Sequence, residues 1–309
     1  MDRYFLVVSM LVLAGCSGGS SKPEGAKVFT VGMSQCNLGE PWRVQMNADI
    51  EAAAKKHSNL KMVFKDAQND TLKQRAHIEE LVSAGVDAII VSPKESQPLT
   101  EPIAKAYQAK IPVIVLDRAV QGDQYTCFIG ADNRKIGKAA GEWLRKKLGP
   151  KATVVELKGL ITSVRGQDRN QGFRAGIEGA GMNVAFEADM KGLEPDARKE
   201  MESALARLSK IDAVYAHNDP GAHGAWLAAK AANREREMLF IGIDALPHEG
   251  IAYVKQGILN ATFQYPTGGA EAIETVLKIL SGQQVAKTIV LGSRVYTAEN
   301  VGQGGEALP

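Results

Sequence analysis

Polar side chains of a particular kind follow several apolar runs of this sequence. Asp117 and Arg118 stand at the end of one run, and Asn218 and Asp244 stand at the ends of two later ones. Arg offers a rigid fork of donors, a carboxylate accepts hydrogen bonds at two oxygens, and an Asn side chain both donates and accepts. Each hydroxyl group of a polyol also donates and accepts. The set is therefore typical of a site that binds a polyol such as a sugar.

An aromatic side chain stands beside a cation in the stretch "GEPWR", where Trp42 precedes Arg43. The C–H face of a sugar ring is apolar and packs on an aromatic ring, so Trp42 would supply the floor of a small-ligand pocket. Pro41 favours the first turn of a helix, which places both side chains at a strand-to-helix junction. The alternative is that Trp42 is a core aromatic beneath this helix.

The other polar residues also have simpler structural interpretations. Asp117 and Arg118 could form a solvated loop pair, and Asp244 could cap the following helix. Asn218 stands two residues before Pro220, which is a capping pattern with Pro in the first turn. Because the same chemistry recurs after four runs, we favour one shared site over four separate structural roles.

The elements that must position these residues alternate along the chain. Short runs rich in Val and Ile are typical of buried parallel strands. They cover residues 28–34, 60–65, 87–92, 111–117, 126–131, 152–158, 183–189, 212–219, 239–244 and 260–266. Between them lie amphipathic stretches with helical spacing, such as 43–57, 71–85, 133–149 and 196–210. This alternation predicts an α/β fold with two doubly wound parallel-sheet lobes, whose ligand lies beyond the carboxyl ends of the strands.

The chain has 309 residues and a formal net charge of +2. The length suggests two domains at roughly 150 residues each. This net charge is too close to zero to indicate nucleic acid or an anionic membrane surface as a partner. Residues 1–15 have the layout of a signal peptide. Leu13-Ala14-Gly15-Cys16 resembles the lipobox of bacterial lipoproteins, which implies that Cys16 is lipidated and that residues 16–26 are a tether. The alternative is an ordinary signal peptide in which Cys16 is incidental.

Two further cysteines, Cys36 and Cys127, lie near the end of one predicted strand and the start of another. These positions argue against a disulfide, so both are predicted to be free thiols. The sequence has no Cys-x-x-Cys and no His-rich pair, so we expect neither a metal site nor a cofactor.

Several fragments, taken in order, resemble the type I periplasmic sugar-binding proteins of ABC transporters, the group that contains the ribose-binding protein. They are "GVDAIIVSP", "IPVIVLDR", "IGADNRKIGKAAGEWL", "VVELKG", "VYAHND" and "FIGID", and the resemblance runs from about residue 28 to 295. "PWR", "QDR" and the "SQ" after the first strand look most like the galactofuranose-binding branch. The resemblance implies an extracytoplasmic, monomeric binder of a monosaccharide that serves an ABC permease, tied to a membrane only by its lipid.

The resemblance also implies a set of ligand-binding residues. They are Ser34, Gln35, Glu40, Trp42, Arg43, Asp117, Arg118, Gln167, Arg169, Met190, Asn218, Asp244 and Gln264. Three of them depart from the ribose binder. Gln167 replaces a basic residue, which counts against ribose itself, and Met190 replaces an aromatic lid. Glu40 replaces Asn, and it either accepts a sugar hydroxyl or favours the helix N-terminus.

The lobe boundaries are also taken from the resemblance. Residues 27–131 with 265–293 would form lobe one, and 132–264 with 294–309 would form lobe two. The chain would cross between them near Asp132, Tyr265 and Arg294, through a three-segment hinge.

Other function classes are less consistent with the sequence. Residues 130–139 are a near miss for a phosphate loop, and no G-x-S-x-G or H-E-x-x-H motif occurs, so we expect no enzyme. Strand-end carboxylates could mimic a glycosidase pair, which the sequence alone leaves open. A repressor would need an N-terminal helix-turn-helix where the signal peptide stands. A protein that presents its ligand to a receptor kinase or chemoreceptor, or a binder of a non-sugar ligand such as an autoinducer, remains an alternative.

Overall fold

The computed structural model describes Met1 and residues 27–309. The predicted signal peptide, Cys16 and the tether lie outside the described residues. Within the described part of the chain, no helix is long and apolar enough to cross a membrane. Cys36 and Cys127 are both buried and free, which confirms the prediction that they form no disulfide.

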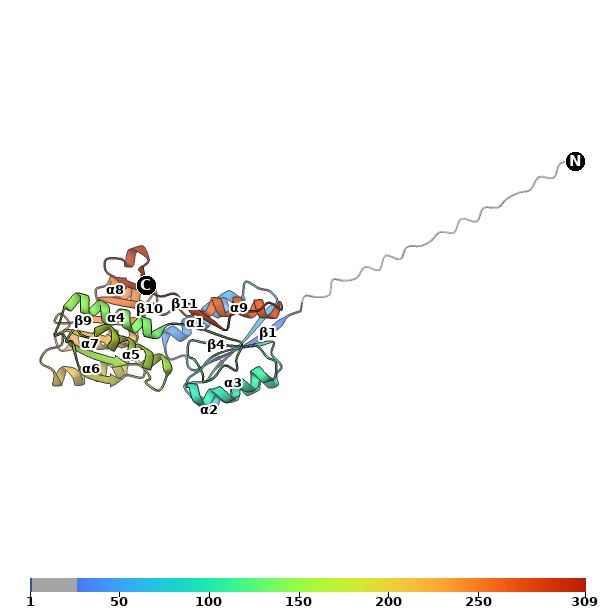
Figure 1. Cartoon of the computed structure of the whole chain (residues 1–309), viewed down its shortest axis with the longest axis horizontal. Helices are drawn as coiled ribbons and strands as arrows, with labels where there is room; N and C mark the ends of the chain where they lie inside the picture. The colour runs from blue at the N-terminus through green and yellow to red at the C-terminus, as the bar shows by residue number, and fades with distance from the viewer. Residues whose placement is uncertain (2–26) are drawn as a thin grey trace.

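Two lobes lie side by side, each built around one sheet (Figure 1). The sheet of lobe one has six strands in the order β11-β5-β4-β3-β1-β2, and neighbouring strands are parallel. Its strands are β1 (Phe29–Gln35), β2 (Leu60–Asp66), β3 (Ala88–Ser92), β4 (Val113–Leu116), β5 (Cys127–Ala131) and β11 (Thr288–Leu291). Its helices are α1 (Pro41–Ala54), α2 (Thr71–Ser83), α3 (Ser96–Gln108) and α9 (Gly269–Leu280).

The sheet of lobe two has seven strands in the order β13-β12-β10-β9-β8-β6-β7. Its strands are β6 (Thr153–Lys158), β7 (Asn183–Asp189), β8 (Ala213–Ala216), β9 (Leu239–Asp244), β10 (Ala261–Gln264), β12 (Arg294–Thr297) and β13 (Glu306–Ala307). Its helices are α4 (Asn133–Leu148), α5 (Val164–Ile177), α6 (Glu194–Arg207), α7 (Asp219–Ala231) and α8 (Gly250–Lys255), with a short 3-10 helix at Val301–Gln303. The pairings of β12 with β10 and with β13 are antiparallel.

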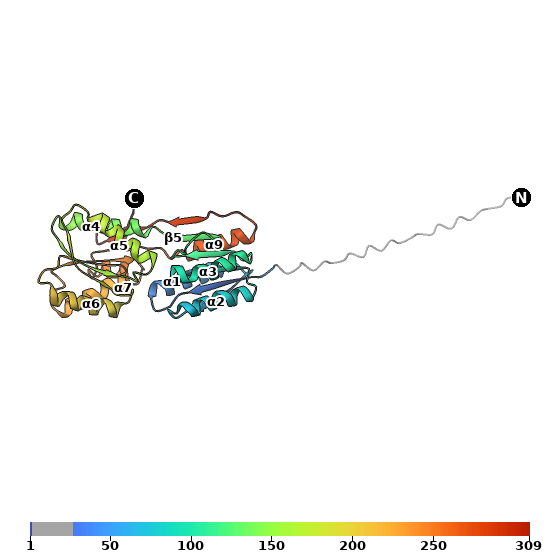
Figure 2. The same ribbon diagram turned by 60° about the horizontal axis from the view of Figure 1, so that its bottom comes forward.

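Each sheet is covered by helices on both faces, as Figure 2 also shows. In lobe one, the alternation along β3 sends Ile89 and Val91 into the core under α2 and α3, whereas Ile90 packs with the residues of α1 and α9. In lobe two, α4 and α5 pack together and α6 and α7 pack together. Because each sheet is buried on both faces, its strands are nearly continuous apolar runs in the sequence.

The chain passes between the sheets at three places. It leaves lobe one after β5, returns after β10, and crosses again between β11 and β12. All ten predicted runs are confirmed as β1 to β10, and the prediction of two doubly wound lobes is confirmed. Strands β11, β12 and β13 were not predicted. β11 and β13 are short edge strands with exposed or half-buried residues, whereas β12 is largely buried between β10 and β13 but has only four residues of mixed polarity.

Candidate functional site

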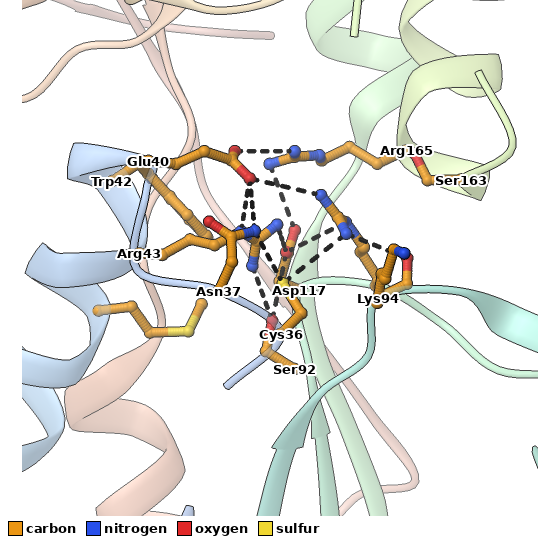
Figure 3. Close-up of polar contacts among 12 residues, drawn as sticks. Cys36, Asn37, Glu40, Trp42, Arg43, Ser92, Lys94, Asp117, Ser163 and Arg165 are labelled. Carbon is orange, nitrogen blue, oxygen red and sulfur yellow. Dashed lines mark hydrogen bonds and ion pairs between the residues drawn. The ribbon is translucent and has the colours of Figure 1, made fainter. Parts of the chain in front are cut away.

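Charged side chains from both lobes meet between the two sheets, at the carboxyl ends of the strands. Figure 3 shows Glu40, Arg43 and Asp117 of lobe one pointing toward one another, with Arg165 of lobe two reaching them from the opposite side. Each of these side chains is buried. Since isolated buried charges are costly, their arrangement in pairs decides whether the site is stable.

Arg43 is the centre of this cluster, and its side chain is fully buried. Its Nε donates to Glu40 Oε1 at 2.9 Å, and Nη2 donates to Asp117 Oδ2 at 3.1 Å. Nη1 donates to Gln35 Oε1 at 3.2 Å and to Ser92 Oγ at 3.0 Å. Burial alone would lower the pKa of Arg43, but the anions around it, including Glu40 and Asp117, raise that pKa well above its usual value.

Glu40 occupies the N-cap position of α1 but does not cap it, because its side chain makes no bond to the helix N–H groups. Oε1 instead accepts from Arg43 and, at 3.1 Å, from Asn37 Nδ2. Burial by itself would raise the pKa of Glu40, yet Arg43, Arg165 and Arg118 more than offset it and hold that pKa far below its usual range. Glu40 therefore does not cap α1 by a hydrogen bond, and its two predicted roles, accepting a sugar hydroxyl or favouring the helix N-terminus through its charge, both stay predictions.

Trp42 is buried, with only 2% of its surface exposed. Its Nε1 donates to the Tyr265 backbone oxygen at 2.8 Å, and the two rings lie 5.1 Å apart. The guanidinium groups of Arg43 and Arg165 lie 5.7 and 6.0 Å from the ring centroid. The core interpretation of Trp42 is therefore confirmed in part, and stacking on a ligand stays a prediction.

Asp117 and Arg118 follow β4 and turn into the cluster, so they are not a solvated loop pair. Asp117 has a φ of 73°, a left-handed conformation that bends the chain directly after the strand. Burial would raise the pKa of Asp117, but Arg165, Arg43 and Arg118 lower it. Arg118 donates to the Lys94 backbone oxygen at 3.0 Å, and burial together with the neighbouring arginines lowers its pKa to about 10.

Lobe two contributes Arg169, Asn218 and Asp244. Arg169 Nε donates to Asn133 Oδ1 at 2.9 Å, Nη1 donates to the His217 backbone oxygen, and its guanidinium lies 4.9 Å from the Tyr265 ring. Asn218 caps α7 by accepting from Gly221 N at 2.9 Å, as its simpler interpretation predicted.

Asp244 does not cap a helix, because Glu249 takes the N-cap position of α8. It lies 3.8 Å from Arg169 Nη2 through Oδ1. Burial raises the pKa of Asp244 to about 7, although Arg169 and Arg165 oppose the increase. This carboxyl group is therefore near its titration midpoint at neutral pH, unlike those of lobe one.

Four of the predicted residues lie at the margin of this cluster or outside it. Gln167 is exposed on α5 and donates to the Ile161 backbone oxygen at 3.1 Å. Met190 is fully buried in the core of lobe two. Gln264 and Asp244 line a separate cavity of about 280 Å³ at the hinge. Ser34 is buried at the end of β1 beneath the cluster.

Arg165 is the principal residue that the sequence analysis missed. It lies in the first turn of α5, where Ser163 caps the helix by accepting from Gly166 N at 3.1 Å. A cation in this turn is opposed by the helix dipole, so it needs another stabilising partner. Arg165 also precedes Arg169 by four residues, which places the two side chains on the same face of the helix. These two signals would have pointed to Arg165 from the sequence.

Several buried polar atoms of the cluster have no hydrogen-bond partner among the residues described. They are Ser34 Oγ, Asp117 Oδ1, Arg118 Nε, Arg169 Nη2 and Asp244 Oδ1. An unsatisfied buried donor or acceptor costs about 1–3 kcal/mol, so a water, an ion or a ligand that binds it stabilises the site. They include donors and acceptors from both lobes, which is what a ligand with several hydroxyl groups needs.

A cavity of about 570 Å³ reaches this cluster from outside. Glu40 and Arg118 line it from lobe one, and Leu160, Lys191 and Leu193 line it from lobe two. The volume lies within the usual range for small-molecule pockets. Among the described residues no group of three or more His, Cys, Asp or Glu has the geometry of a metal site.

Comparison with known proteins assigns the family. The model of the periplasmic binding protein domain matches residues 31–284. The chain belongs to the periplasmic binding protein family. This membership implies a location outside the cytoplasm.

Known relatives of this periplasmic binding protein cover nearly the same length. The ribose import binding protein RbsB of Bacillus subtilis (strain 168) is 32% identical over 292 residues, which cover 92% of this chain and 94% of that protein. The galactofuranose-binding protein YtfQ of Escherichia coli (strain K12) is 31% identical over 250 residues, or 77% and 78% of the two chains. Among solved structures, the fructose binding periplasmic domain of a hybrid two component system is 39% identical with a TM-score of 0.86, and the match covers 89% and 93% of the two chains. The resemblance stated from the motifs is thereby confirmed.

Proposed function

We propose that this protein captures a monosaccharide between its lobes and delivers it to the permease of an ABC importer. The observation that carries the proposal is the buried cluster of arginines and carboxylates, which comes from both lobes and leaves donors and acceptors unsatisfied. Relatives named for the import or binding of ribose and galactofuranose support the choice of a sugar. A ligand with adjacent hydroxyl groups would satisfy several of these atoms at once.

In this proposal, ligand binding and lobe closure are linked. A ligand that contacts Asp117 of lobe one and Arg169 of lobe two makes both sets of contacts only when the lobes are closed. It therefore shifts the open–closed equilibrium by its differential affinity for the closed form, which the permease then recognises. Several charge-assisted hydrogen bonds in an enclosed site would give micromolar affinity, on the order of −8 kcal/mol.

A thermal-shift panel tests the sugar assignment. Full-length protein is heated with D-ribose, D-fructose, D-galactose, L-arabinose, amino acids or nucleosides. One sugar should raise the melting temperature by several degrees, because a ligand that binds only the folded state stabilises it. The variant Asp117→Asn should lose most of this shift, and Asp123→Asn, at an exposed position outside the site, should keep it. A shift with amino acids or nucleosides and none with sugars would refute the assignment.

The lipid anchor is a second part of the proposal. From the Leu13-Ala14-Gly15-Cys16 stretch, we propose that Cys16 carries the lipid and that the protein is otherwise a monomer without a membrane-spanning part. In a bacterial host, Cys16→Ala should abolish labelling with radioactive palmitate, and Cys127→Ala should retain it. Continued labelling of the Cys16 variant would refute the anchor.

The domain division and the absence of catalysis are also proposals. The crossings between the sheets support lobe boundaries at residues 131/132, 264/265 and 293/294. The chain belongs to a family of binding proteins, and we propose that it catalyses no reaction. Two alternatives have less support: presentation of the ligand to a sensor, and a ligand such as an autoinducer. The relative RbsB is named for ribose import, which favours a role in import of a sugar. The similar fructose-binding domain belongs to a two-component system, and we do not extend that signalling role to this chain.

A further inference from the structure

Arg165 joins the two lobes directly. Its Nη2 lies 3.5 Å from Glu40 Oε2, and its Nη1 lies 3.9 Å from Asp117 Oδ1 (Figure 3). Arg165 belongs to lobe two and both carboxylates belong to lobe one. Among the ion pairs formed by the described residues, these two connect residues 132–264 with residues 27–131.

The two oxygens of each carboxylate have different partners. Arg43 of lobe one takes Glu40 Oε1 and Asp117 Oδ2. Arg165 faces the other oxygen of each group, Glu40 Oε2 and Asp117 Oδ1. Arg43 therefore fixes the inner oxygens whether the lobes are open or closed, whereas Arg165 reaches the outer oxygens only when the lobes meet.

The backbone on either side of Arg165 is fixed by its contacts. Ser163 caps α5, and Gly166 lies so close to the preceding loop that a Cβ there would be 2.5 Å from the Leu160 backbone oxygen. The guanidinium group is planar with fixed donor directions, and 10% of the side chain is exposed. It cannot move away from the carboxylates without opening the lobes or changing its rotamer inside the interface.

We propose that Arg165 is a specificity-determining residue of the sugar site and the principal charge that holds the lobes together. This inference rests on the proposed function. Among the described residues Asp117 Oδ1 has no hydrogen-bond partner and Glu40 Oε2 has only Arg165, so these outer oxygens are the ones left for a ligand hydroxyl. A ligand must therefore present hydroxyl groups that fit beside the Arg165 guanidinium, and ligands that are too large there are rejected. Arg165 would contact these hydroxyl groups itself, and it would also position the two carboxylates that accept from them.

The first measurement needs no sugar. Spin labels are attached to keto amino acids introduced at Glu79 on α2 and Glu202 on α6, which are exposed on different lobes. Double electron–electron resonance then gives the distances between them in the full chain. Arg165→Met keeps the length of the side chain without its charge, and it should move the ligand-free distribution toward longer distances. Arg165→Lys should give an intermediate distribution.

The second measurement is calorimetry with the same sugar panel. Arg165→Met should weaken binding of the sugar that the unaltered protein prefers by about tenfold or more, and it should compress the differences among the sugars. Arg165→Lys should restore part of the affinity and part of the differences among the sugars. Arg134→Met is the matched control, because Arg134 pairs on the surface with Asp168 within lobe two, and it should leave distances and preferences unchanged.

The outcomes separate this inference from the proposed function. Unchanged ligand-free distances in both Arg165 variants would overturn the role in closure, and an unchanged order of sugar preference would overturn the role in specificity. If no sugar binds the unaltered protein, the proposed function fails, and the distance measurement still tests closure. Arg165→Lys retains the charge and serves as the test if Arg165→Met does not fold.

Discussion

The buried carboxyl groups on the two sides of the cleft have different partners and opposite pKa shifts. On the lobe-one side, Glu40 and Asp117 share Arg43, and the arginines hold both carboxyl pKa values below their usual range. On the lobe-two side, Asp219 and Asp244 have raised pKa values, mainly because they are buried and, for Asp219, because Asp244 lies near.

Their local partners explain this difference. Asp219 is fully buried and accepts from Thr262 Oγ1 and Ala245 N, both at 2.7 Å, but no described cation pairs with it. Those bonds hold the turn after β9, where Asp244 and Ala245 have φ values of 126° and 55°. Lobe one thus presents a fixed, ionised surface, whereas lobe two presents a carboxyl group whose charge depends on pH near neutrality. Burial raises the pKa of every one of these carboxyl groups, and the pKa falls below its usual range only where nearby arginines outweigh burial.

The largest expected effect comes from removing the centre of the lobe-one cluster. Arg43→Met leaves Glu40 and Asp117 buried without their main partner, and breaking a buried pair in this way costs about 3–5 kcal/mol. Urea unfolding should show this loss in the free energy of unfolding. Arg75→Met is the control, since Arg75 pairs with the exposed Glu101 and its loss should cost less than about 1 kcal/mol. Equal effects of the two variants would mean that the buried cluster is no more important than a surface pair.

Trp42→Ala should destabilise the protein by about 3 kcal/mol, because it removes a buried aromatic side chain and leaves a cavity. The variant should also weaken sugar binding by about 2 kcal/mol, if the ring supports the ligand. The burial of Trp42 is the reason to expect a loss of stability as well as of affinity. Trp42→Phe separates the two effects, because it keeps a ring but loses the hydrogen bond to Tyr265. Calorimetry and urea unfolding measure both quantities, and unchanged affinity in Trp42→Ala would rule out the stacking role.

The sequence predicted the fold well because the alternation of apolar strands and amphipathic helices is a local signal. It placed four residues at or shortly after strand ends, and the structure brings them together in the cleft: Arg43, Asp117, Arg169 and Asp244. The edge strands β11 and β13 were not predicted because they are short and partly exposed, and β12 was not predicted because its four residues are of mixed polarity.

The partners within the site were harder to predict than its location. The family motif led to Gln167, but side-chain direction on a helix depends on spacing: Arg165 and Arg169 share a face, and Gln167 lies between them on another. Which oxygen of Glu40 or Asp117 meets which arginine depends on the approach of two lobes, and no pattern within one segment encodes that.

The opposite pH responses of the two lobes give a smaller effect. A carboxyl group with a raised pKa holds its proton in the folded state at a pH where the unfolded chain has lost it. The stability contribution of Asp244 should therefore fall as pH rises from about 4 to about 7, by on the order of 1 kcal/mol per pH unit. Glu40 has a lowered pKa, so its contribution is present above about pH 4 and is lost on further acidification.

The variant Asp244→Asn tests this contrast. Urea unfolding between pH 5 and pH 8 should show a smaller decrease in stability with rising pH than in the unaltered protein. Asp123→Asn, at an exposed position in lobe one, should leave the slope unchanged. If Asp244→Asn has the same slope as the unaltered protein, then Asp244 is ionised throughout this range and does not contribute to the difference between the lobes.

The smallest expected effect is at Gln167, and it separates the family motif from the structure. Gln167 is exposed and its amide donates to Ile161 within the same loop region, so it makes no contact with the arginine–carboxylate cluster. Gln167→Ala should change the affinity for the preferred sugar by less than about twofold and the stability by less than about 0.5 kcal/mol. A ligand contact at this position would instead cost about 1 kcal/mol or more, because a lost hydrogen bond leaves a partner unsatisfied. Calorimetry distinguishes the two results, with Arg169→Met as the comparison, since Arg169 lies on the buried face of the same helix and its loss should greatly weaken binding. If the two variants weaken binding equally, the motif is the better guide to this side of the cleft, and α5 must turn its exposed face toward the ligand on binding.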